Sequence, residues 1–305
     1  MTKIAIGMPV FNGANYISQA LDSILAQTFG DFEVFISDNA SDDGTQDICQ
    51  QYALKDRRIR YLRQTCNVGA AANHNLLVGQ GNGPYFKWAS HDDILAPRFL
   101  EEAVGVLDSR PEIVLASPAS ALIDELGQLL PFSPERGGVV DRSGVCWPCM
   151  PEKNDGLTNG DAAVRFQAVV LKTVMCVEIY GLMRRSALMQ TSLLGPFGGA
   201  DKVLLAQMAL LGPFWLGSEV LFHRRCHSKQ FSSTVSGAYR AMWFSGRKDS
   251  LLKQQFKLLI AYCRSANGYQ LGLQQRASCY LSIARRALFR GNQLRRLTSG
   301  LVGNP

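Results

Sequence analysis

The sequence predicts an α/β fold with a mostly parallel, twisted sheet flanked by helices, followed by a helical extension at the C-terminus. Two observations predict it. Apolar, β-prone runs alternate with helix-period segments up to about residue 116, and the chain beyond about residue 237 has helical patterning only. Repeated βα units of this length favour parallel strands. With 305 residues, 47% of them hydrophobic and 19% charged, the chain is long enough for a large core.

The first half of the chain supplies five strands and the helices between them. Each predicted strand is a short apolar run: residues 3–10, 32–37, 59–62, 84–89 and 113–116. The four intervening helices show apolar residues at helical spacing. The first has Ile17, Leu21 and Ile24, and the second has Ile48, Cys49 and Tyr52. The third runs through Leu77, and the fourth has Leu100, Ala103, Val104 and Leu107. Strand and helix therefore alternate four times before the fifth strand.

The second half has a different organisation. Residues 131–159 are rich in Gly, Pro and charge and lack periodicity, which predicts a long loop lying over a site. Helical patterning resumes at Asp161, and two further helices are expected around residues 251–266 and 274–290. We therefore expect a main domain at 1–236, with halves at 1–125 and 126–236, and a helical extension at 237–305.

Charge is concentrated at the C-terminal end of the chain. Residues 246–305 contain eleven Lys or Arg and one acid, Asp249, whereas the other 245 residues carry a net charge of −3. Such asymmetry indicates an anionic partner. The N-terminus lacks an apolar leader-like region, and the cysteines are scattered, which favours a cytoplasmic location with reduced thiols.

The basic extension is typical of an amphipathic helix. Its arginines alternate with apolar residues: Arg276, Arg285, Arg286, Arg290, Arg295 and Arg296 lie among Leu281, Leu288 and Phe289. This pattern suits peripheral attachment to an anionic membrane surface at the inner face of the membrane. The chain has no zinc-finger, RNP or helix-turn-helix signature, so nucleic acid is not expected as a partner. A solvated basic face is the alternative interpretation.

Polar and turn-forming residues follow each of the first four strands. The first strand ends at Pro9-Val10-Phe11-Asn12-Gly13, the second at Asp38, the third at Asn67-Val68-Gly69 and the fourth at Asp92-Asp93. Ligands of open α/β sheets bind outside the carboxyl ends of the strands, which these four junctions share. Four ordinary turns are the alternative, but they do not explain why acids gather beside an aromatic residue.

The two adjacent acids suggest a cation site. Asp92 and Asp93 follow an apolar strand and precede a helix, and carboxylates hold Mg²⁺ or Mn²⁺, which in turn bridge phosphates. The competing interpretation is a helix cap, in which Asp93 accepts hydrogen bonds from the N–H groups of the first helical turn.

Taken in order and spacing, these motifs resemble glycosyltransferase family 2, whose nucleotide-sugar-binding fold is called GT-A and is Rossmann-like. The resemblance is dense over residues 4–124 and recurs at 195–232. Its pieces are Pro9-Val10-Phe11-Asn12, the run from Ser23 to Phe29, the run from Phe32 to Thr45, Asn67-Val68-Gly69, and Asp92-Asp93-Ile94-Leu95 with Pro97. It implies an inverting transfer from a nucleotide-diphosphate sugar, most simply a UDP-sugar, to a saccharide or lipid-linked acceptor in surface polysaccharide synthesis.

The resemblance also implies roles for individual residues. It makes residues 1–125 the nucleotide-binding half and 126–236 the acceptor-side half. The nucleotide-binding set is Pro9, Val10, Phe11, Asn12, Asp38, Asn67, Gly69 and Asp92, with the Asp38 carboxylate on the base. Asp92 corresponds to the family's metal ligand for Mn²⁺ or Mg²⁺, and Asp93 and His227 are candidates to complete the site. Arg224 or Arg225 could neutralise phosphate.

Asp201 corresponds to the family's catalytic base. It opens an apolar helix after Gly198-Gly199, and an inverting transfer needs a carboxylate that removes a proton from the acceptor hydroxyl. The alternative role for Asp201 is an acid stabilised by the helix dipole.

Two departures from the family pattern keep other functions open. Ser90 stands where the family has an acid, and Asn39 replaces a second acid after Asp38. A degenerate, non-catalytic member that binds a nucleotide or partner is therefore one rival. A nucleotidyltransferase is another, although residues 7–13 lack the basic, Gly-dense loop of that class.

Overall fold

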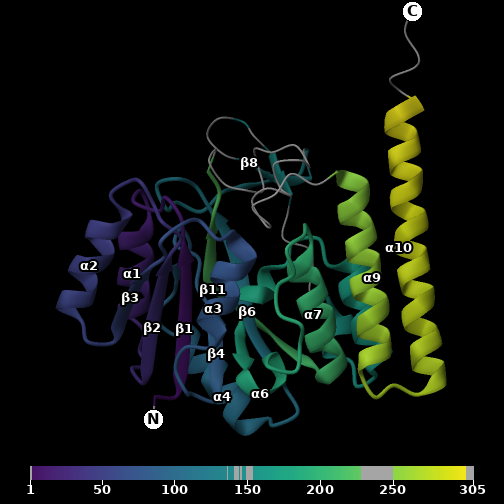
Figure 1. Ribbon diagram of the computed structural model, residues 1–305, viewed down its shortest axis with the longest axis horizontal. Helices are drawn as coiled ribbons and strands as arrows, with labels where there is room; N and C mark the ends of the chain where they lie inside the picture. Colours follow the sequence, from purple (N-terminus) through teal and green to yellow (C-terminus); the bar gives the residue numbers. More distant parts are fainter. Residues whose placement is uncertain are drawn as a thin grey trace, which may run out of the picture.

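The computed structural model describes residues 2–135, 137–140, 144, 146–148, 154–227 and 250–299. Within these residues a central sheet of eight strands is covered by helices, and two long helices stand side by side at one end (Figure 1). The strand order is β3-β2-β1-β4-β10-β6-β11-β5. The predicted α/β sheet with flanking helices and C-terminal helices is therefore present.

The elements have the following bounds. The main sheet consists of β1 (Ile4–Val10), β2 (Phe32–Asp38), β3 (Ile59–Arg63), β4 (Tyr85–Trp88), β5 (Ile94–Leu95), β6 (Leu115–Ile123), β10 (Leu182–Arg184) and β11 (Phe214–Arg225). The helices are α1 (Ile17–Leu25), α2 (Thr45–Lys55), α3 (Ala70–Val78), α4 (Phe99–Ser109), α5 (Ala162–Gln167), α6 (Arg185–Leu188), α7 (Ala200–Leu211), α9 (Leu251–Gly268) and α10 (Leu273–Ser299). Single turns occur at η1 (Asp155–Thr158), η2 (Ala168–Lys172) and η3 (Val177–Tyr180).

The first four strands run parallel to one another. β1 pairs with β2 and β4, and β2 pairs with β3, all in parallel. In this register Val10 lies opposite Asp38, and Asp38 lies opposite Arg63. The carboxyl ends of these strands therefore share one edge of the sheet, as the sequence predicts.

The structure also contains strands that the sequence pattern does not reveal. β10 is only three residues long and lies antiparallel between β4 and β6, while the edge strand β5 pairs antiparallel with β11. Residues 131–159 are not a featureless loop, because β7 (Phe132–Ser133), β8 (Gly138–Val140) and β9 (Cys146–Pro148) pair into a small antiparallel sheet. Strands of two or three residues are too short to produce a detectable alternation.

Alternation along β1 divides the hydrophobic core between the two faces of the sheet. Ile4, Ile6 and Met8 pack with residues of α1 and α4 on one face, whereas Ala5 belongs to the core formed with α3, α5 and α7 on the other. Both faces are covered, which explains why β1 is apolar at every position.

The C-terminal helices are packed onto the main domain. Leu258 and Tyr262 of α9, and Cys279 and Ile283 of α10, belong to the same core as α5 and α7. The far end of α10 extends beyond the body of the molecule (Figure 1). Among the helices that the structure describes, none combines the length and the apolarity needed to span a bilayer.

Candidate functional site

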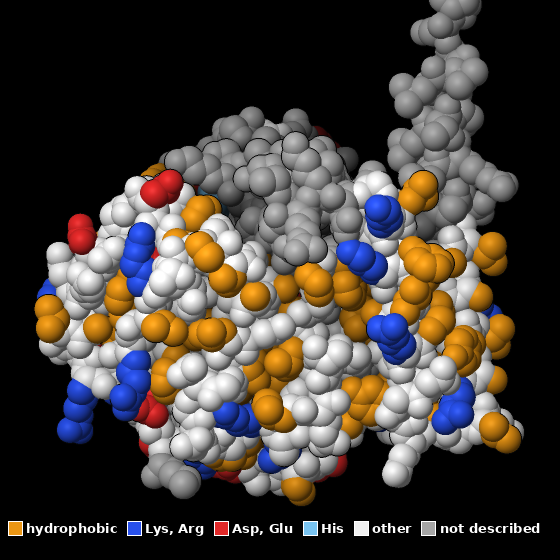
Figure 2. All heavy atoms as spheres, viewed as in Figure 1, with side chains coloured by type: hydrophobic (Ala, Val, Ile, Leu, Met, Phe, Trp, Pro, Cys, Tyr) orange, Lys and Arg blue, Asp and Glu red, His pale blue; other side chains and the backbone are white. Residues whose placement is uncertain are grey.

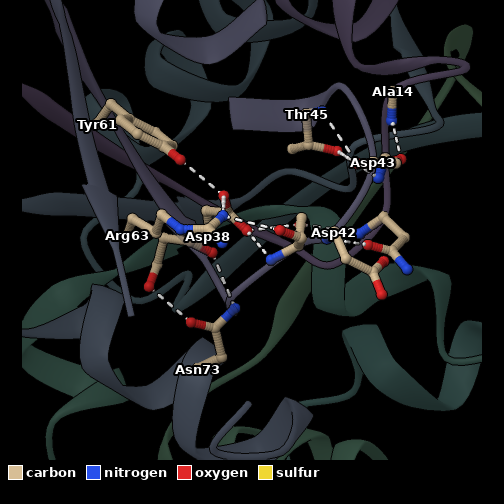
Figure 3. A network of polar contacts seen from close by, with 12 residues as sticks. Ala14, Asp38, Asp42, Asp43, Thr45, Tyr61, Arg63 and Asn73 are labelled. Carbon is tan, nitrogen blue, oxygen red and sulfur yellow. Dashed lines mark hydrogen bonds and ion pairs between the residues drawn. The ribbon is translucent and has the colours of Figure 1, made fainter. Parts of the chain in front are cut away.

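Asp38, the last residue of β2, is fully buried and completely hydrogen-bonded within the protein (Figure 3). Its Oδ1 accepts from the backbone N–H and the hydroxyl of Ser41, at 2.9 and 2.5 Å. Its Oδ2 accepts from the Tyr61 hydroxyl at 2.7 Å and the Arg63 guanidinium at 3.0 Å. This carboxylate therefore orders the turn after β2, and its predicted contact with a nucleobase would require an exchange of these partners.

The turn after β1 is fastened to the turn after β2. The Asn12 N–H donates to Ser41 Oγ at 2.9 Å, and Asn12 Oδ1 accepts from the Asp42 N–H at 3.0 Å. Asn12 and Ala40 both have positive φ, 55° and 61°. Strained non-glycine conformations of this kind are enriched at ligand-binding sites. The backbone conformation thus supports a functional role for this edge.

The predicted nucleotide-binding residues of the first junction differ in how far their side chains are exposed. Pro9 and Val10 are buried within β1, so their side chains belong to the core. Phe11 is 42% exposed, and its ring is available to a ligand. The glycine at position 13 has a steric cause, since a Cβ there would lie 2.7 Å from the His91 ring. A side chain at position 13 would therefore force the Val10 side chain or the His91 ring of the fourth junction to move.

Asn39 joins the second junction to the third. Its Nδ2 donates to Asn67 Oδ1 at 2.9 Å, and its Oδ1 accepts from the Val68 N–H at 2.8 Å. Asn67 Oδ1 also accepts from the N–H of Gly69, whose φ is 84°. An amide at position 39 both donates and accepts here, which a carboxylate cannot do. This explains structurally why Asn replaces the family's acid at this position.

Asp92 lies against His227, although 135 residues separate them in the sequence. His227 Nε2 is 3.1 Å from Asp92 Oδ2, and the Ser90 hydroxyl donates to Asp92 Oδ1. Burial opposes ionisation of Asp92, but the hydrogen bond from His227, the charge of His91 and the hydrogen bond from Ser90 together outweigh it and hold the pKa of Asp92 well below its usual range. Asp92 is therefore an anion at neutral pH, with an imidazole beside it.

Asp93 occupies a different environment. It is buried, its Oδ1 accepts from the backbone N–H of Arg225 at 2.9 Å, and burial together with the charge of Asp92 raises its pKa. The helix-cap interpretation is wrong, because Asp93 is followed by β5 and the next helix begins only at Phe99. The structure brings Asp92 and His227 together but does not add Asp93 to them.

Arg225 has a structural role, which corrects the prediction that it could neutralise phosphate. It is fully buried, and its guanidinium donates to the carbonyls of Asp92, Asp124 and Glu125 at 2.8 to 3.1 Å and to Gln19 Oε1 at 2.7 Å. The guanidinium also lies 4.8 Å from the centre of the Tyr16 ring. Arg225 thus fixes the backbone beneath Asp92.

Asp201 lies in the first turn of α7, directly after Gly199, whose φ is 86°. Its Oδ1 accepts from the Lys202 N–H at 2.8 Å. Burial and the charge of Asp201 raise the pKa of the Cys176 thiol, so this thiol stays protonated. The position is compatible both with a base and with an acid stabilised by the helix dipole.

The turn η3 carries site residues that the sequence reasoning missed. The pKa of Tyr180 is raised by burial, then by the charges of Asp93 and Asp92, with a smaller effect of Asp201, so Tyr180 lies within electrostatic reach of both groups of acids. On the same turn, Glu178 has a buried Oε2 without a hydrogen-bond partner, and burial raises the pKa of Glu178 to about 7. An acid within the apolar run from Met175 to Tyr180 is the signal that could have identified this turn.

A buried lysine is hydrogen-bonded to the same turn. Lys87 of β4 has no exposed surface, its ammonium donates to the Tyr180 carbonyl, and it lies 4.3 Å from the centre of the Phe99 ring. Burial lowers the pKa of Lys87 to about 7, opposed by the charge of Asp93. His74, by contrast, has a structural role, since burial lowers its pKa to about 4 and its Nδ1 contacts the Ala70 carbonyl at 2.8 Å.

The metal-ligating capacity of the site is limited. Among the described residues, no group of three or more His, Cys, Asp and Glu side chains is placed to hold an ion. Asp92 and His227 provide two adjacent ligands. Mg²⁺ and Mn²⁺ sites in phosphate-binding enzymes often consist of one or two protein ligands completed by water and substrate phosphates, so these two residues fit a cation that arrives with a diphosphate.

The sequence comparisons agree with this geometry. Residues 5–131 match the family described as Glycosyl transferase family 2. The putative glycosyltransferase EpsE of Bacillus subtilis is 29% identical over 149 residues, which cover 47% of this chain and 54% of EpsE. An uncharacterized glycosyltransferase of Rickettsia typhi is 33% identical over 132 residues, which cover 42% of this chain and 40% of that protein. The chain thus spans about half or less of the length of these relatives.

Solved structures show the same fold over nearly the whole chain. S. aureus TarS in complex with UDP-GlcNAc has a TM-score of 0.66 at 14% identity and covers 93% of this chain and 72% of its own. The mannosyltransferase PcManGT from Pyrobaculum calidifontis, in complex with GDP-Man and Mn²⁺, has a TM-score of 0.51 at 14% identity and covers 98% of this chain and 80% of its own. The predictions of family and fold are confirmed: residues 5–131 match glycosyltransferase family 2, and the chain has a GT-A-like fold.

Proposed function

We propose that this chain transfers a sugar from a nucleotide-diphosphate donor to an acceptor hydroxyl, with inversion at the anomeric carbon. The family match over residues 5–131 and the likeness to TarS, which is described in complex with UDP-GlcNAc, support a UDP-linked donor. The acceptor is proposed to be a saccharide or a lipid-linked saccharide in surface polysaccharide synthesis, a class suggested by resemblance to such enzymes.

The observation that carries the proposal is the meeting of four strand-end junctions at one edge of the sheet. Hydrogen bonds link the first junction to the second through Asn12 and the second to the third through Asn39. The fourth junction brings Asp92 against His227. This edge has backbone turns, an exposed aromatic ring and one ionised carboxylate. Recognition of a nucleoside diphosphate needs features of these kinds.

In this reaction Asp201 acts as the general base. Its carboxylate removes the proton from the attacking acceptor hydroxyl, so that the oxygen is nucleophilic when it reaches the anomeric carbon. The Lys202 N–H donates to Asp201 Oδ1 and so helps to fix the orientation of this carboxylate. Tyr180 and its turn connect this base to the Asp92 region, since the charges of both Asp92 and Asp201 act on Tyr180.

Asp92 and His227 would hold a divalent cation on the donor diphosphate. A cation bound there would act as a Lewis acid that stabilises the charge of the leaving group. Arg225 positions Asp92 by binding its carbonyl oxygen, and the Ser90 hydroxyl orients the carboxylate. Ser90 adds no negative charge, so the site provides fewer anionic ligands than the family pattern with an acid at this position.

The test is nucleotide release from candidate donors in the presence of Mn²⁺ and simple saccharide acceptors. We expect the wild-type protein to release UDP from a UDP-sugar, and Asp201→Asn to lose about 100-fold or more of this activity while retaining UDP affinity. Asp31→Asn, an exposed acid between α1 and β2, is the matched control and should be unaffected.

Two results would contradict the proposal. Undiminished turnover by Asp201→Asn would place the base elsewhere. A protein that binds UDP but releases none from any UDP- or GDP-sugar would favour the degenerate, non-catalytic alternative, which the replacements at Ser90 and Asn39 keep open.

A further inference from the structure

The outer face of α10 is apolar, which is unusual for a helix on the surface of a globular protein. Its inner face is fixed to the body by Cys279 and Ile283, which are buried, and by Arg286, which donates to the Val170 carbonyl at 2.7 Å. Gln275 also donates to Asp161 Oδ2 at 2.9 Å. The orientation of α10 about its own axis is therefore set by these contacts, and so is the face that it presents outward.

The residues that point outward form a continuous row, which we call the outer stripe. Its members recur every three or four positions and are all exposed: Leu273, Ala277, Leu281, Ala284 and Leu288. Leu273 is 85% exposed, Leu281 60% and Leu288 70%. At 1.5 Å per residue the stripe is about 22 Å long. An apolar row of this length facing water marks an interaction surface.

The neighbouring helix also exposes apolar side chains. Leu252 and Phe256 on α9 are 75% and 67% exposed, one helical turn apart. Lys253, Lys257 and Arg264 are exposed on the same helix. Figure 2 shows hydrophobic and basic side chains interspersed over α9 and α10, without an acidic side chain between them on this face.

The charge of the region identifies the partner. Residues 250–305 contain nine Lys or Arg and no Asp or Glu. An acyl-chain boundary accepts the apolar row and anionic headgroups neutralise the bases, so an anionic bilayer satisfies both features at once. A second copy of the chain would bring two basic surfaces together without any acid to neutralise them, which disfavours self-association through this face.

We propose that the outer stripe of α10, with Leu252 and Phe256 of α9, docks the protein on an anionic lipid bilayer. The helix lies in the plane of the interface, its leucines enter the headgroup region, and Lys253, Lys257, Arg264 and Arg285 contact anionic headgroups. One part of the predicted basic face is corrected by the structure: Arg286 points inward to Val170 and does not contribute. Because α10 shares the core of the main domain, docking holds the whole molecule in one orientation to the surface.

The experiment is co-sedimentation of the full chain with vesicles at low salt, comparing phosphatidylcholine alone with phosphatidylcholine containing phosphatidylglycerol. We expect binding to the anionic vesicles only. Leu281→Ser combined with Leu288→Ser should weaken this binding about tenfold or more, since both side chains lose their apolar surface. Both positions are exposed, so the fold should be retained, which circular dichroism checks.

Leu54→Ser is the matched control, because Leu54 is 88% exposed on α2, far from the stripe in the sequence, and its loss should not change vesicle binding. Absence of binding to anionic vesicles, equal binding to neutral ones, or full binding by the double variant would each overturn the proposal. A dimer in sedimentation equilibrium that the double variant abolishes, without vesicle binding by the wild type, would assign the stripe to a second copy. None of these results bears on sugar transfer, which is assayed with soluble donors.

Discussion

Glu178 provides the sharpest physical prediction, because its environment opposes ionisation. Its Oε2 is buried without a hydrogen-bond partner in the described part of the chain, and its pKa is raised from 4.5 to about 7 by burial, partly offset by Lys202. A raised pKa means that the folded protein prefers the protonated form. The folded state therefore has its full stability from this group below about pH 4.5, and loses stability as the pH rises through 7.

The size of the effect follows from the shift in pKa. A shift from 4.5 to about 7 corresponds to about 3 kcal/mol of difference between the two protonation states. Part of the side chain remains in contact with water, so we expect about 1–2 kcal/mol in practice. Glu178→Gln keeps the shape of the side chain but cannot ionise. It should be more stable than wild type by this amount at pH 8.5 and nearly equal to it at pH 4.5.

The assay is urea unfolding of both proteins at pH 4.5, 6.5 and 8.5, followed by fluorescence. The difference in the free energy of unfolding isolates Glu178, because Asp93, Lys87 and His74 titrate equally in both proteins. A difference that is the same at all three pH values would refute the reasoning. It would show that Glu178 is ionised without cost and is solvated or paired in a way that the structure does not contain.

Three further predictions concern the loops around the site. Arg225→Met should lower the free energy of unfolding by about 3–5 kcal/mol, measured by urea unfolding, because the hydrogen bonds of the buried Arg225 guanidinium to four acceptors are lost; a change below about 1 kcal/mol would contradict this. Asn39→Asp should destabilise the protein by about 1–3 kcal/mol, since a carboxylate would face Asn67 Oδ1 without a proton to donate, and thermal unfolding that shows no loss would argue against this contact. Ser90→Asp should tighten Mn²⁺-dependent UDP binding about tenfold by adding a carboxylate beside Asp92, and calorimetry that shows weaker binding would mean that the two acids repel instead.

The parallel half of the fold could be predicted because its signals are local and repeated. Residues 17–25 form the expected helix, and the first four strands end where polar residues begin. β10 and β5 could not be predicted in the same way, since three or two residues carry no measurable period and their pairing depends on strands far along the chain. The sequence predicts elements that are long enough to repeat a pattern.

The candidate site was predictable where its residues lie in motifs and not where tertiary contacts decide their role. Asp92 and His227 could each be named, but only the fold shows that they touch. Arg224 and Arg225 are indistinguishable in sequence. In the structure, Arg225 is buried and its guanidinium donates hydrogen bonds to three backbone carbonyls. Glu178 belongs to no motif, and its significance arises from burial alone.

The central claim is that the edge formed by the four junctions binds a nucleoside diphosphate through Asp92 and a divalent cation. Calorimetric titration of UDP, with and without Mn²⁺, tests it most directly, with GDP and dTDP as controls and with Asp92→Asn beside the wild type. We predict that the wild type binds UDP in a Mn²⁺-dependent manner and that Asp92→Asn loses the metal-dependent part. The absence of binding for every nucleotide, or metal-dependent binding that is unchanged in Asp92→Asn, would contradict the claim.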